Sequence, residues 1–231
     1  MKAPRSAAAR RAIGLYGTAP RGDRVHVRVR WWSAPLVQVE RATPGRGRVL
    51  EIGCGHGLLS LYLALSGPER RVVGVDIDRD KIAIARQAAG RLTEGEAHVS
   101  FVAVEPGELP KGPFDAVVVC DVLYLLGPAA RAALIHAAVD QLGPDGVLLL
   151  KETARTPRWK NALNVVQERL ATRVLRITEG DTVDFADPAR FVEQLRGRGL
   201  DTGVRRIDKG YPHPHVLVTA RRAAVPAKRA P

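Results

Sequence analysis

The sequence predicts an α/β fold in which a mostly parallel sheet is doubly wound, with helices on both of its faces. Short runs rich in Val, Leu and Ile alternate along the chain with segments of about a dozen residues at helical spacing, which is the pattern of such a sheet. The first of these runs ends in a glycine-rich turn that opens a helix. With 231 residues and no internal repeat, the chain has the length of one domain with a large core.

The glycine-rich turn joins the apolar run at residues 49–52 to a helix predicted to begin at Leu58. Glycine stands at every second position of the turn, at Gly53, Gly55 and Gly57. Glycine adopts positive φ easily and places no Cβ between the backbone and a ligand. The helix that follows directs unpaired N–H groups and a partial positive charge toward the same place. The turn therefore predicts a ligand site, although a tight strand-to-helix connection without a ligand has similar features.

An acidic residue, Asp76, follows the second apolar run at residues 72–75 and comes nineteen positions after Gly57. A carboxylate at this place accepts hydrogen bonds from the ribose hydroxyls of a nucleoside. A dinucleotide site requires the spacing G-x-G-x-x-G, but Leu58 occupies the position of its third glycine. Glu51, just before the turn, suits a sulfonium cation better than a pyrophosphate. The residues favour a nucleoside cofactor over NAD(P).

The motif E-x-G-x-G-x-G after a Val/Leu strand, followed by Asp76, resembles the first motifs of class I S-adenosylmethionine (SAM) methyltransferases. The resemblance is strong over residues 48–153 and weak over residues 187–220. It implies a Rossmann-like, mostly parallel seven-stranded sheet that ends in an antiparallel C-terminal hairpin. It also implies that SAM is the cofactor and that methyl transfer is the reaction.

The resemblance assigns cofactor contacts to positions at the ends of successive strands. Glu105 stands four positions before Leu109-Pro110, where the family usually has an Asp that binds the adenine amino group. Pro106 holds Glu105 in extended geometry. The full set implied for the cofactor is Glu51, Gly53, Cys54, Gly55, Gly57, Asp76, Ile77, Glu105 and Cys120.

The acceptor is expected beside the end of the fourth strand, at residues 114–121. Asp121 and Tyr124 are the first catalytic candidates, and His213 in a proline-rich turn is a third. Simpler roles remain open: Asp121 can cap a turn, Tyr124 can pack, and His213 can belong to a turn fixed by proline. No metal site is expected, because His213 and His215 have no Cys or further His near them. The Asn/Asp-Pro-Pro-Tyr motif of many base-amine methyltransferases is absent after this strand.

The net charge of +12 is spread unevenly. Residues 1–48 hold 11 Lys/Arg and 2 acids, which gives +9, and residues 219–231 hold 4 Lys/Arg, which gives +4. The remaining 21 Lys/Arg and 22 acids give −1, so the predicted catalytic domain is nearly neutral. Basic segments of this kind bind RNA, anionic lipid or an acidic partner.

Residues 24–31 alternate strictly between basic and apolar side chains, which predicts a strand. In that strand, Arg24, His26, Arg28 and Arg30 face one way and the valines face the other. The basic row then either binds a row of phosphates, on nucleic acid or on lipid headgroups, or is simply a solvated face of a packed strand.

Three segments divide the chain: a basic extension at residues 1–47, partly packed on the core, a methyltransferase domain at 48–222, and a disordered tail at 223–231. Within the domain, an insertion at about 154–186 has helical spacing. The resemblance implies a lid over the acceptor site, and ordinary core packing is the alternative. No apolar run has the length of about 20 residues needed to span a bilayer. The two cysteines and the lack of a secretory signal favour the cytoplasm. An Arg-rich, acid-poor start also resembles a mitochondrial transit peptide, but the whole chain shares this composition.

The sequence thus predicts a SAM-dependent methyltransferase that acts on a small-molecule or lipid-like acceptor, with oxygen or carbon as the favoured acceptor atom. An alternative is an RNA methyltransferase whose basic arm holds phosphates. A non-catalytic SAM-binding subunit is a third possibility. If the first 21 residues serve only a partner, their removal should leave SAM binding nearly intact. The sequence sets no oligomeric state.

Overall fold

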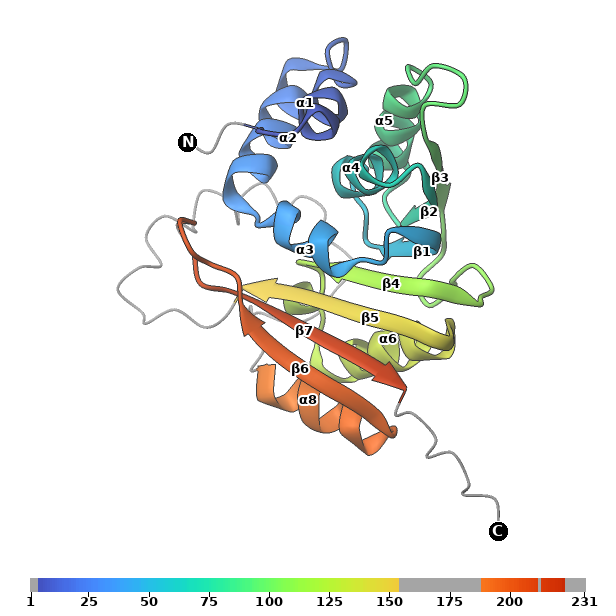
Figure 1. Ribbon diagram of the computed structural model, residues 1–231, viewed down its shortest axis with the longest axis vertical. Helices are drawn as coiled ribbons and strands as arrows, with labels where there is room; N and C mark the ends of the chain where they lie inside the picture. Colours follow the sequence, from blue (N-terminus) through green and yellow to red (C-terminus); the bar gives the residue numbers. More distant parts are fainter. Residues whose placement is uncertain (1–3, 154–187, 212, 223–231) are drawn as a thin grey trace.

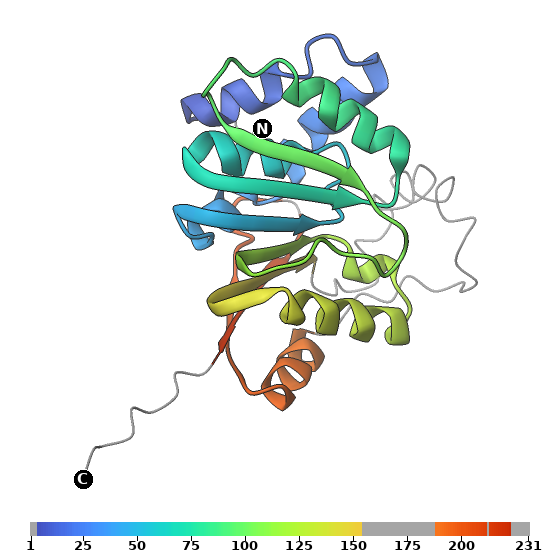
Figure 2. The ribbon, with the colours of Figure 1, turned by 90° about the vertical axis from the view of Figure 1, so that its right-hand side faces the viewer.

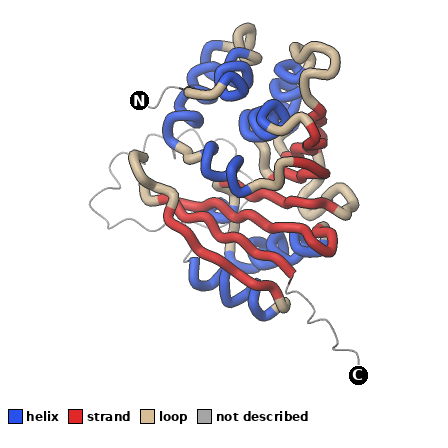
Figure 3. Tube along the Cα trace, viewed as in Figure 1, coloured by secondary structure: helices blue, strands red, loops and turns tan. Residues whose placement is uncertain are grey.

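One seven-stranded sheet forms the centre of the molecule (Figures 1 and 3). The computed structural model describes residues 4–153, 188–211 and 213–222, so the predicted insertion and the predicted tail lie outside the described residues. The strand order is β3-β2-β1-β4-β5-β7-β6, and all neighbours are parallel except those of β7. The strands are β1 (Arg46–Ile52), β2 (Glu69–Asp76), β3 (His98–Ala103), β4 (Phe114–Cys120), β5 (Leu142–Thr153), β6 (Leu200–Arg206) and β7 (His215–Arg222). The predicted fold class is confirmed.

Helices cover both faces of the sheet (Figure 2). One face carries α1 (Ala7–Gly14), α2 (Arg21–Ser33), α3 (Leu36–Ala42), α4 (Leu58–Ser66) and α5 (Arg79–Ala89), whose buried side chains share one apolar cluster. The other face carries α6 (Pro128–Asp140) and α8 (Pro188–Gly197), whose buried side chains form a second cluster. A short 3-10 turn, η1 (Leu123–Leu125), follows β4.

The central strands are apolar on both faces because both faces are covered. In β1, Val49 packs into one apolar cluster while Leu50 and Ile52 pack into the other. β1 pairs with β2 on one side and with β4 on the other. From β1 the chain forms β2 and β3 on the first side, and it then returns past β1 to form β4 on the second side. Ligands of doubly wound sheets bind at such a switch point, beyond the carboxyl ends of the two strands.

The strand predicted over residues 24–31 is wrong, because this segment belongs to helix α2. The helix begins after Pro20 and ends before Pro35. Val27 and Trp31, four residues apart, are buried on one side of the helix, whereas Val25 and Val29 are exposed. Alternation alone did not decide the structure, since the same residues also satisfy the spacing of four that a helix uses to pack one face. The extended row of basic side chains therefore does not exist.

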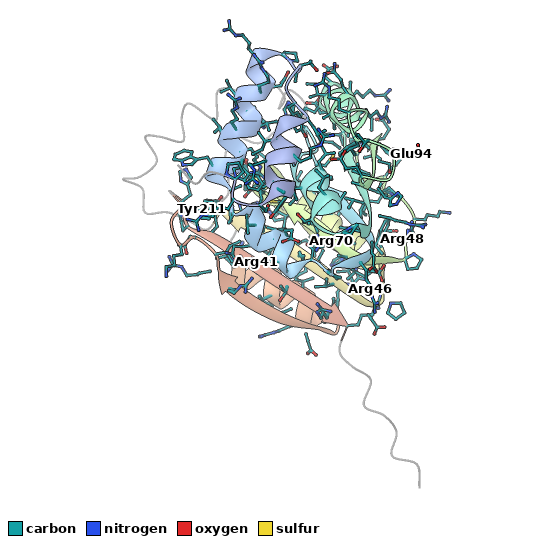
Figure 4. All side chains as sticks on the ribbon, turned by 45° about the horizontal axis from the view of Figure 1, so that its top comes forward. Arg41, Arg46, Arg48, Arg70, Glu94 and Tyr211 are labelled. Atoms are coloured by element: carbon teal, nitrogen blue, oxygen red, sulfur yellow. The ribbon has the colours of Figure 1, made fainter. Side chains whose placement is uncertain are left out.

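Polar contacts bind the N-terminal helical segment to the rest of the domain near its start and near its end. Near the end of α3, the buried side chain of Arg70 donates to the Glu40 carboxylate at 3.0 Å and to the backbone oxygens of Thr43 and Pro44 at 3.0 and 2.7 Å (Figure 4). Near the start, Arg11 on α1 pairs with Glu96 at 2.6 Å. Among the helices of the described ranges, none has the length and apolar character of a membrane span.

Candidate active site

The three glycines of the turn after β1 have different neighbours. All three have positive φ: +73° at Gly53, +53° at Gly55 and +79° at Gly57. A Cβ on Gly53 would collide with Val122, and one on Gly57 would lie 2.5 Å from the ring of Phe101. At Gly55 the nearest atom to such a Cβ is 3.9 Å away, on Lys81. Gly53 and Gly57 therefore serve close packing, and Gly55 leaves open space over the turn, where a ligand fits.

Asp76 fixes this turn from the end of the neighbouring strand β2. Its carboxylate accepts hydrogen bonds from the backbone N–H groups of Gly55 at 2.7 Å and Asp78 at 2.9 Å. The N–H groups of Gly53 and Cys54 donate to the carbonyl of Val75 at 2.8 and 2.9 Å. A carboxylate has about four lone-pair positions, so Asp76 keeps two for ribose hydroxyls. The residues at this place fit the predicted cofactor.

Ile77 and Glu105 lie at the ends of β2 and β3. The side chain of Ile77 is 55% exposed, which is unusual for isoleucine and suits a residue that packs against the flat base of a nucleoside. Glu105 is exposed and pairs with Arg79 at 2.7 Å. Contact between Glu105 and an adenine amino group therefore remains a prediction, since its carboxylate points to an arginine in this structure.

Glu51 is buried beneath the turn, where Ser60 on α4 donates a hydrogen bond to its carboxylate. Burial raises the pKa of Glu51 to about 7, although Ser60 and Arg30 act in the opposite direction. A cationic ligand beside this carboxylate would favour its ionised form. This is the expected place for the positively charged part of SAM.

The N-terminal helices cover the turn, which the sequence did not indicate. The hydroxyl of Tyr16, after α1, donates to the backbone oxygen of His56 at 2.6 Å. The His56 ring lies 3.1 Å from the carboxylate of Asp23 on α2, and its centroid is 4.6 Å from that of His26. Burial lowers the pKa of His26 to about 4. The backbone of His56 thus holds the segment after α1 against the glycine turn, and its ring holds α2 there.

Asp121, directly after β4, lies between two cations. Of the described non-glycine residues it alone has positive φ, at +56°. Both of its carboxylate oxygens lie 2.5 Å from Nζ of Lys151 on β5, and one lies 2.5 Å from Nη1 of Arg30 on α2. Burial alone would raise the pKa of Asp121, but Lys151 and Arg30 outweigh it and hold this pKa far below its usual value. Asp121 stays ionised, and both oxygens are occupied.

The sequence analysis missed Lys151 and gave Arg30 a different role, in a row of phosphate-binding residues. The only local indication of this charged cluster is Lys151 itself. It stands at the end of the long apolar run of β5, where a buried charge requires a partner. Nη2 of Arg30 also donates to the backbone oxygen of Cys120 at 3.2 Å, so α2 is bound to the end of β4 at two points. The sequence gives no sign that these residues meet.

Glu152, the residue after Lys151, supports the turn on the other side. Its Oε1 accepts from the N–H groups of Val122 at 3.2 Å and Leu123 at 3.0 Å. Within the described residues, its buried Oε2 has no hydrogen-bond partner. Burial and the neighbouring Asp121 raise the pKa of Glu152. Burial also raises the pKa of nearby Tyr124 to about 12, so Tyr124 carries a hydroxyl proton at neutral pH.

The two histidines of the C-terminal turn have different positions. His215 is buried and its Nε2 lies 2.9 Å from the backbone oxygen of Ser33 at the end of α2. His213 is half-buried, and its ring centroid is 6.4 Å from that of His215. Figure 4 shows Tyr211, in the same turn, at the end of the sheet opposite to Arg46 and Arg48. The turn therefore lies at the carboxyl end of the strands, as the site does.

Both cysteines are buried and unpaired, and burial raises the pKa of each thiol. Their chemistry is that of small apolar side chains, not of nucleophiles. In the part of the chain that the structure describes, no group of three or more His, Cys, Asp or Glu side chains is arranged to hold a metal ion.

This fold and this site together define a class of protein. A switch-point turn, an acid on each of β1 and β2, and an antiparallel β7 are the features of class I SAM-dependent methyltransferases. The family model described as "Methyltransferase domain" matches residues 49–146. The chain belongs to this family: it is an enzyme that transfers methyl groups and uses SAM as its cofactor.

Individual relatives agree with this assignment. A ubiquinone biosynthesis O-methyltransferase of Xanthomonas axonopodis pv. citri (strain 306) is 32% identical over 190 residues, which cover 74% of this chain and 75% of that protein. One of Xanthomonas campestris pv. campestris (strain B100) is 32% identical over 184 residues, with 72% and 74% covered. The fold matches that of magnesium protoporphyrin IX methyltransferase from Synechocystis PCC 6803, solved with bound SAH, at a TM-score of 0.64, with 21% identity and 93% and 94% covered.

Proposed function

We propose that this enzyme methylates a hydroxyl oxygen of a small, lipid-like molecule of the kind used in ubiquinone biosynthesis. The relatives with that name share about a third of their residues with this chain over three quarters of both lengths. The preference for oxygen over carbon follows their name.

The observation that carries the proposal is the buried group formed by Asp121, Lys151 and Arg30. Two cations and one carboxylate leave a net charge of +1 at the carboxyl ends of β4 and β5. A hydroxyl oxygen becomes more nucleophilic as it loses its proton, and fixed cationic donors stabilise the negative charge that develops. In this proposal Arg30, whose side chain is 29% exposed, receives the acceptor oxygen, while Asp121 orients Arg30 and the buried Lys151 adds positive charge behind it.

Each of the predicted cofactor residues has a role in the proposal. We propose that Gly53, Gly55 and Gly57 shape the turn against SAM, with Asp76 at its ribose and Glu51 at its cationic end. Ile77 and Glu105 would border the adenine, and Cys54 and Cys120 would line the space between base and methyl group. SAM supplies an activated methyl group, and the protein aligns the acceptor oxygen with the bond that breaks.

Tyr124 and His213 have proposed roles on the acceptor side. Tyr124 retains its proton at neutral pH, so we propose that it contacts the acceptor as a hydrogen-bond donor rather than as a base. His213 lies in the turn beside His215, and a role in proton removal rests on this position alone. The proposed site of action is the cytoplasm, which the two free cysteines support.

The RNA alternative keeps the +9 charge of residues 1–48 but loses the extended row of arginines, because the alternating segment is helical. Relatives named for O-methyl transfer in quinone biosynthesis further favour the small-molecule acceptor.

Methyl-labelled SAM tests the proposed function with two matched acceptors. One is an alkylated aromatic compound with a free hydroxyl, and the other is its methoxy analogue. Label on the hydroxyl compound alone is the expected result. Equal labelling of both compounds would indicate carbon methylation, and labelling only of RNA from a cell extract would contradict the proposal. Arg30→Gln should lower kcat about a hundredfold while SAM affinity changes little.

A further inference from the structure

Helix α2 has an apolar strip on the side that faces away from the protein. Val25, Val29 and Trp32 are 59%, 39% and 41% exposed. Their spacing of four and three residues places them on one face of the helix. They account for three of the seven large hydrophobic side chains found exposed in the described part of the chain. Single exposed apolar residues are common, but three on one short helix form a continuous strip.

Arginines border this strip along one side. Arg21 and Arg28 are exposed, and their spacing along the helix places them next to Trp32 and Val25. The ion pairs found among the described residues include neither of these two arginines. Arg24, one turn away, is half-buried and donates to the backbone oxygen of Gly17 at 3.2 Å. The outer face of α2 is thus apolar in the middle and positively charged at its edge.

The inner face of the same helix reaches the acceptor-side cluster. Val27 and Trp31 are buried in the core, and Arg30 contacts Asp121 at 2.5 Å. Ser33, in the last turn of the helix, accepts a bond from His215 at its backbone oxygen. One helix therefore links an exposed amphipathic surface to the place where the acceptor is proposed to bind.

We propose that the outer face of α2, formed by Val25, Val29, Trp32, Arg21 and Arg28, docks on an anionic lipid surface. Apolar side chains of a surface helix enter the headgroup region, tryptophan favours that depth, and arginines beside them meet lipid phosphates. Phosphates of RNA would pair with the arginines but leave the apolar strip in water. An anionic bilayer satisfies both features of this face.

Docking through α2 would place the proposed methyl transfer at a membrane surface. The inference rests on the proposed function only where it explains why docking is useful to the enzyme. An acceptor with a lipid tail is dissolved in the membrane, and an enzyme docked through α2 has its acceptor-side cluster at the other face of the docked helix. Docking itself requires only the exposed face. Lipid binding and methyl transfer can therefore be tested separately.

The first experiment is co-sedimentation of the full chain with vesicles made of phosphatidylglycerol and phosphatidylcholine in equal parts, compared with vesicles of phosphatidylcholine alone. Two variants change the face: one carries Val25→Ser, Val29→Ser and Trp32→Ser, and the other carries Arg21→Gln and Arg28→Gln. The control is Val204→Ser on β6, since Val204 is 53% exposed and is followed by the exposed Arg205. SAM affinity, measured in parallel, reports that each variant is folded.

The expected result is binding to anionic vesicles only, lowered at least tenfold in the apolar variant. The arginine variant should bind about fivefold more weakly for each charge removed. The control should bind like the unchanged protein. Methyl transfer to an acceptor dispersed in detergent should be the same in all variants, so a loss of lipid binding is distinguishable from a wrong function. Binding that is unaffected by either variant, binding to RNA in place of vesicles, or a stable dimer that buries this face would overturn the inference.

Discussion

Asp121 shows how several constraints converge on one residue. Its positive φ is strained for most side chains, but Asp and Asn tolerate it better than others. Its carboxylate balances Lys151, which is fully buried, and Arg30, which comes from a helix 91 positions earlier in the chain. Removal of one partner from a buried ion pair leaves the other charge uncompensated.

Asp121→Asn therefore isolates the charge, because asparagine keeps the shape and tolerates the backbone angle. We expect this variant to lower the free energy of unfolding by about 3–5 kcal/mol, measured by urea denaturation at neutral pH. Asp145→Asn is the control, since Asp145 is exposed at the start of β5, and it should change stability by less than about 0.5 kcal/mol. A loss below about 1 kcal/mol in Asp121→Asn would mean that the two cations do not depend on this carboxylate.

Asp76 has a double role in the cofactor turn, and its substitution should show both. Asp76→Ala removes the acceptor of the Gly55 and Asp78 N–H groups and the proposed acceptor of the ribose hydroxyls. Each bond lost to a charged group costs about 1.5–3 kcal/mol, so SAM affinity measured by calorimetry should fall by ten- to hundredfold or more. Asp80→Ala, in the exposed first turn of α5, should bind SAM normally. Unchanged affinity in Asp76→Ala would remove Asp76 from the cofactor site.

Glu51 makes cofactor binding depend on pH. Its pKa is about 7 without ligand, and a cationic ligand favours the ionised carboxylate. SAM affinity should therefore rise between pH about 5.5 and about 7.5, by up to about tenfold per pH unit on the acid side. Glu51→Gln should abolish this dependence, as followed by calorimetry across the same range. The free protein shows the opposite sign: the stability from the neutral buried carboxyl is full below pH about 4.5 and falls as the pH rises to about 7.

At the scale of elements, the N-terminal helices are part of the folded core. Ala9, Ala12, Leu15 and Tyr16 are buried in the same cluster as α4. The charge pattern of the sequence suggested an appendage, because its arginines are numerous and its apolar residues are small or widely spaced. The structure buries most of those apolar residues, with Val25, Val29 and Trp32 exposed, and leaves most of the arginines at the surface.

Removal of the first 17 residues should therefore affect the cofactor site. The truncated protein loses α1 and the bond from Tyr16 to His56, so we expect lower thermal stability and weaker SAM binding. Tyr16→Phe is the milder comparison, since it keeps the packing and should cost about 1 kcal/mol in unfolding free energy. If the truncated protein bound SAM as tightly as the full chain, the first 17 residues would instead be a tail that serves a partner.

For the whole molecule, topology decides where the site lies. β1 and β4 are neighbours although β2 and β3 come between them in sequence, so the glycine turn and Asp121 meet at one edge of the sheet. Because the predicted cofactor residues lie at the ends of four strands, β1 to β4, a ligand bound there should stabilise the whole domain.

S-adenosylhomocysteine at a hundred times its Kd should stabilise the fold by about 2.7 kcal/mol. For a chain of this length that corresponds to a rise in Tm of about 5–10 °C, measured by calorimetry. The same concentration should raise the Tm of Asp76→Ala much less. Equal shifts in both proteins would show that the ligand binds somewhere other than the turn.

Much of the fold was predictable from local patterns. The turn of Gly53, Gly55 and Gly57, the acid Asp76, and the apolar runs of β1, β2 and β4 each follow from residues close together in sequence. Helix α2 was not predicted, because residues 24–31 satisfy the periods of both a strand and a helix, and only the packing of Val27 and Trp31 against the core selects the helix. Asp121 was predicted as a candidate, but its partners were not.

The sequence by itself determined the family, the cofactor and the fold class, because these depend on motifs a few residues long whose chemistry is fixed by residue type and spacing. Only the tertiary structure decided what surrounds the acceptor side. Arg30, Asp121 and Lys151 come from three elements, separated by 91 and 30 positions. Their contact arises from the packing of α2 across the ends of β4 and β5, and no local pattern encodes the meeting of charges so far apart in the chain.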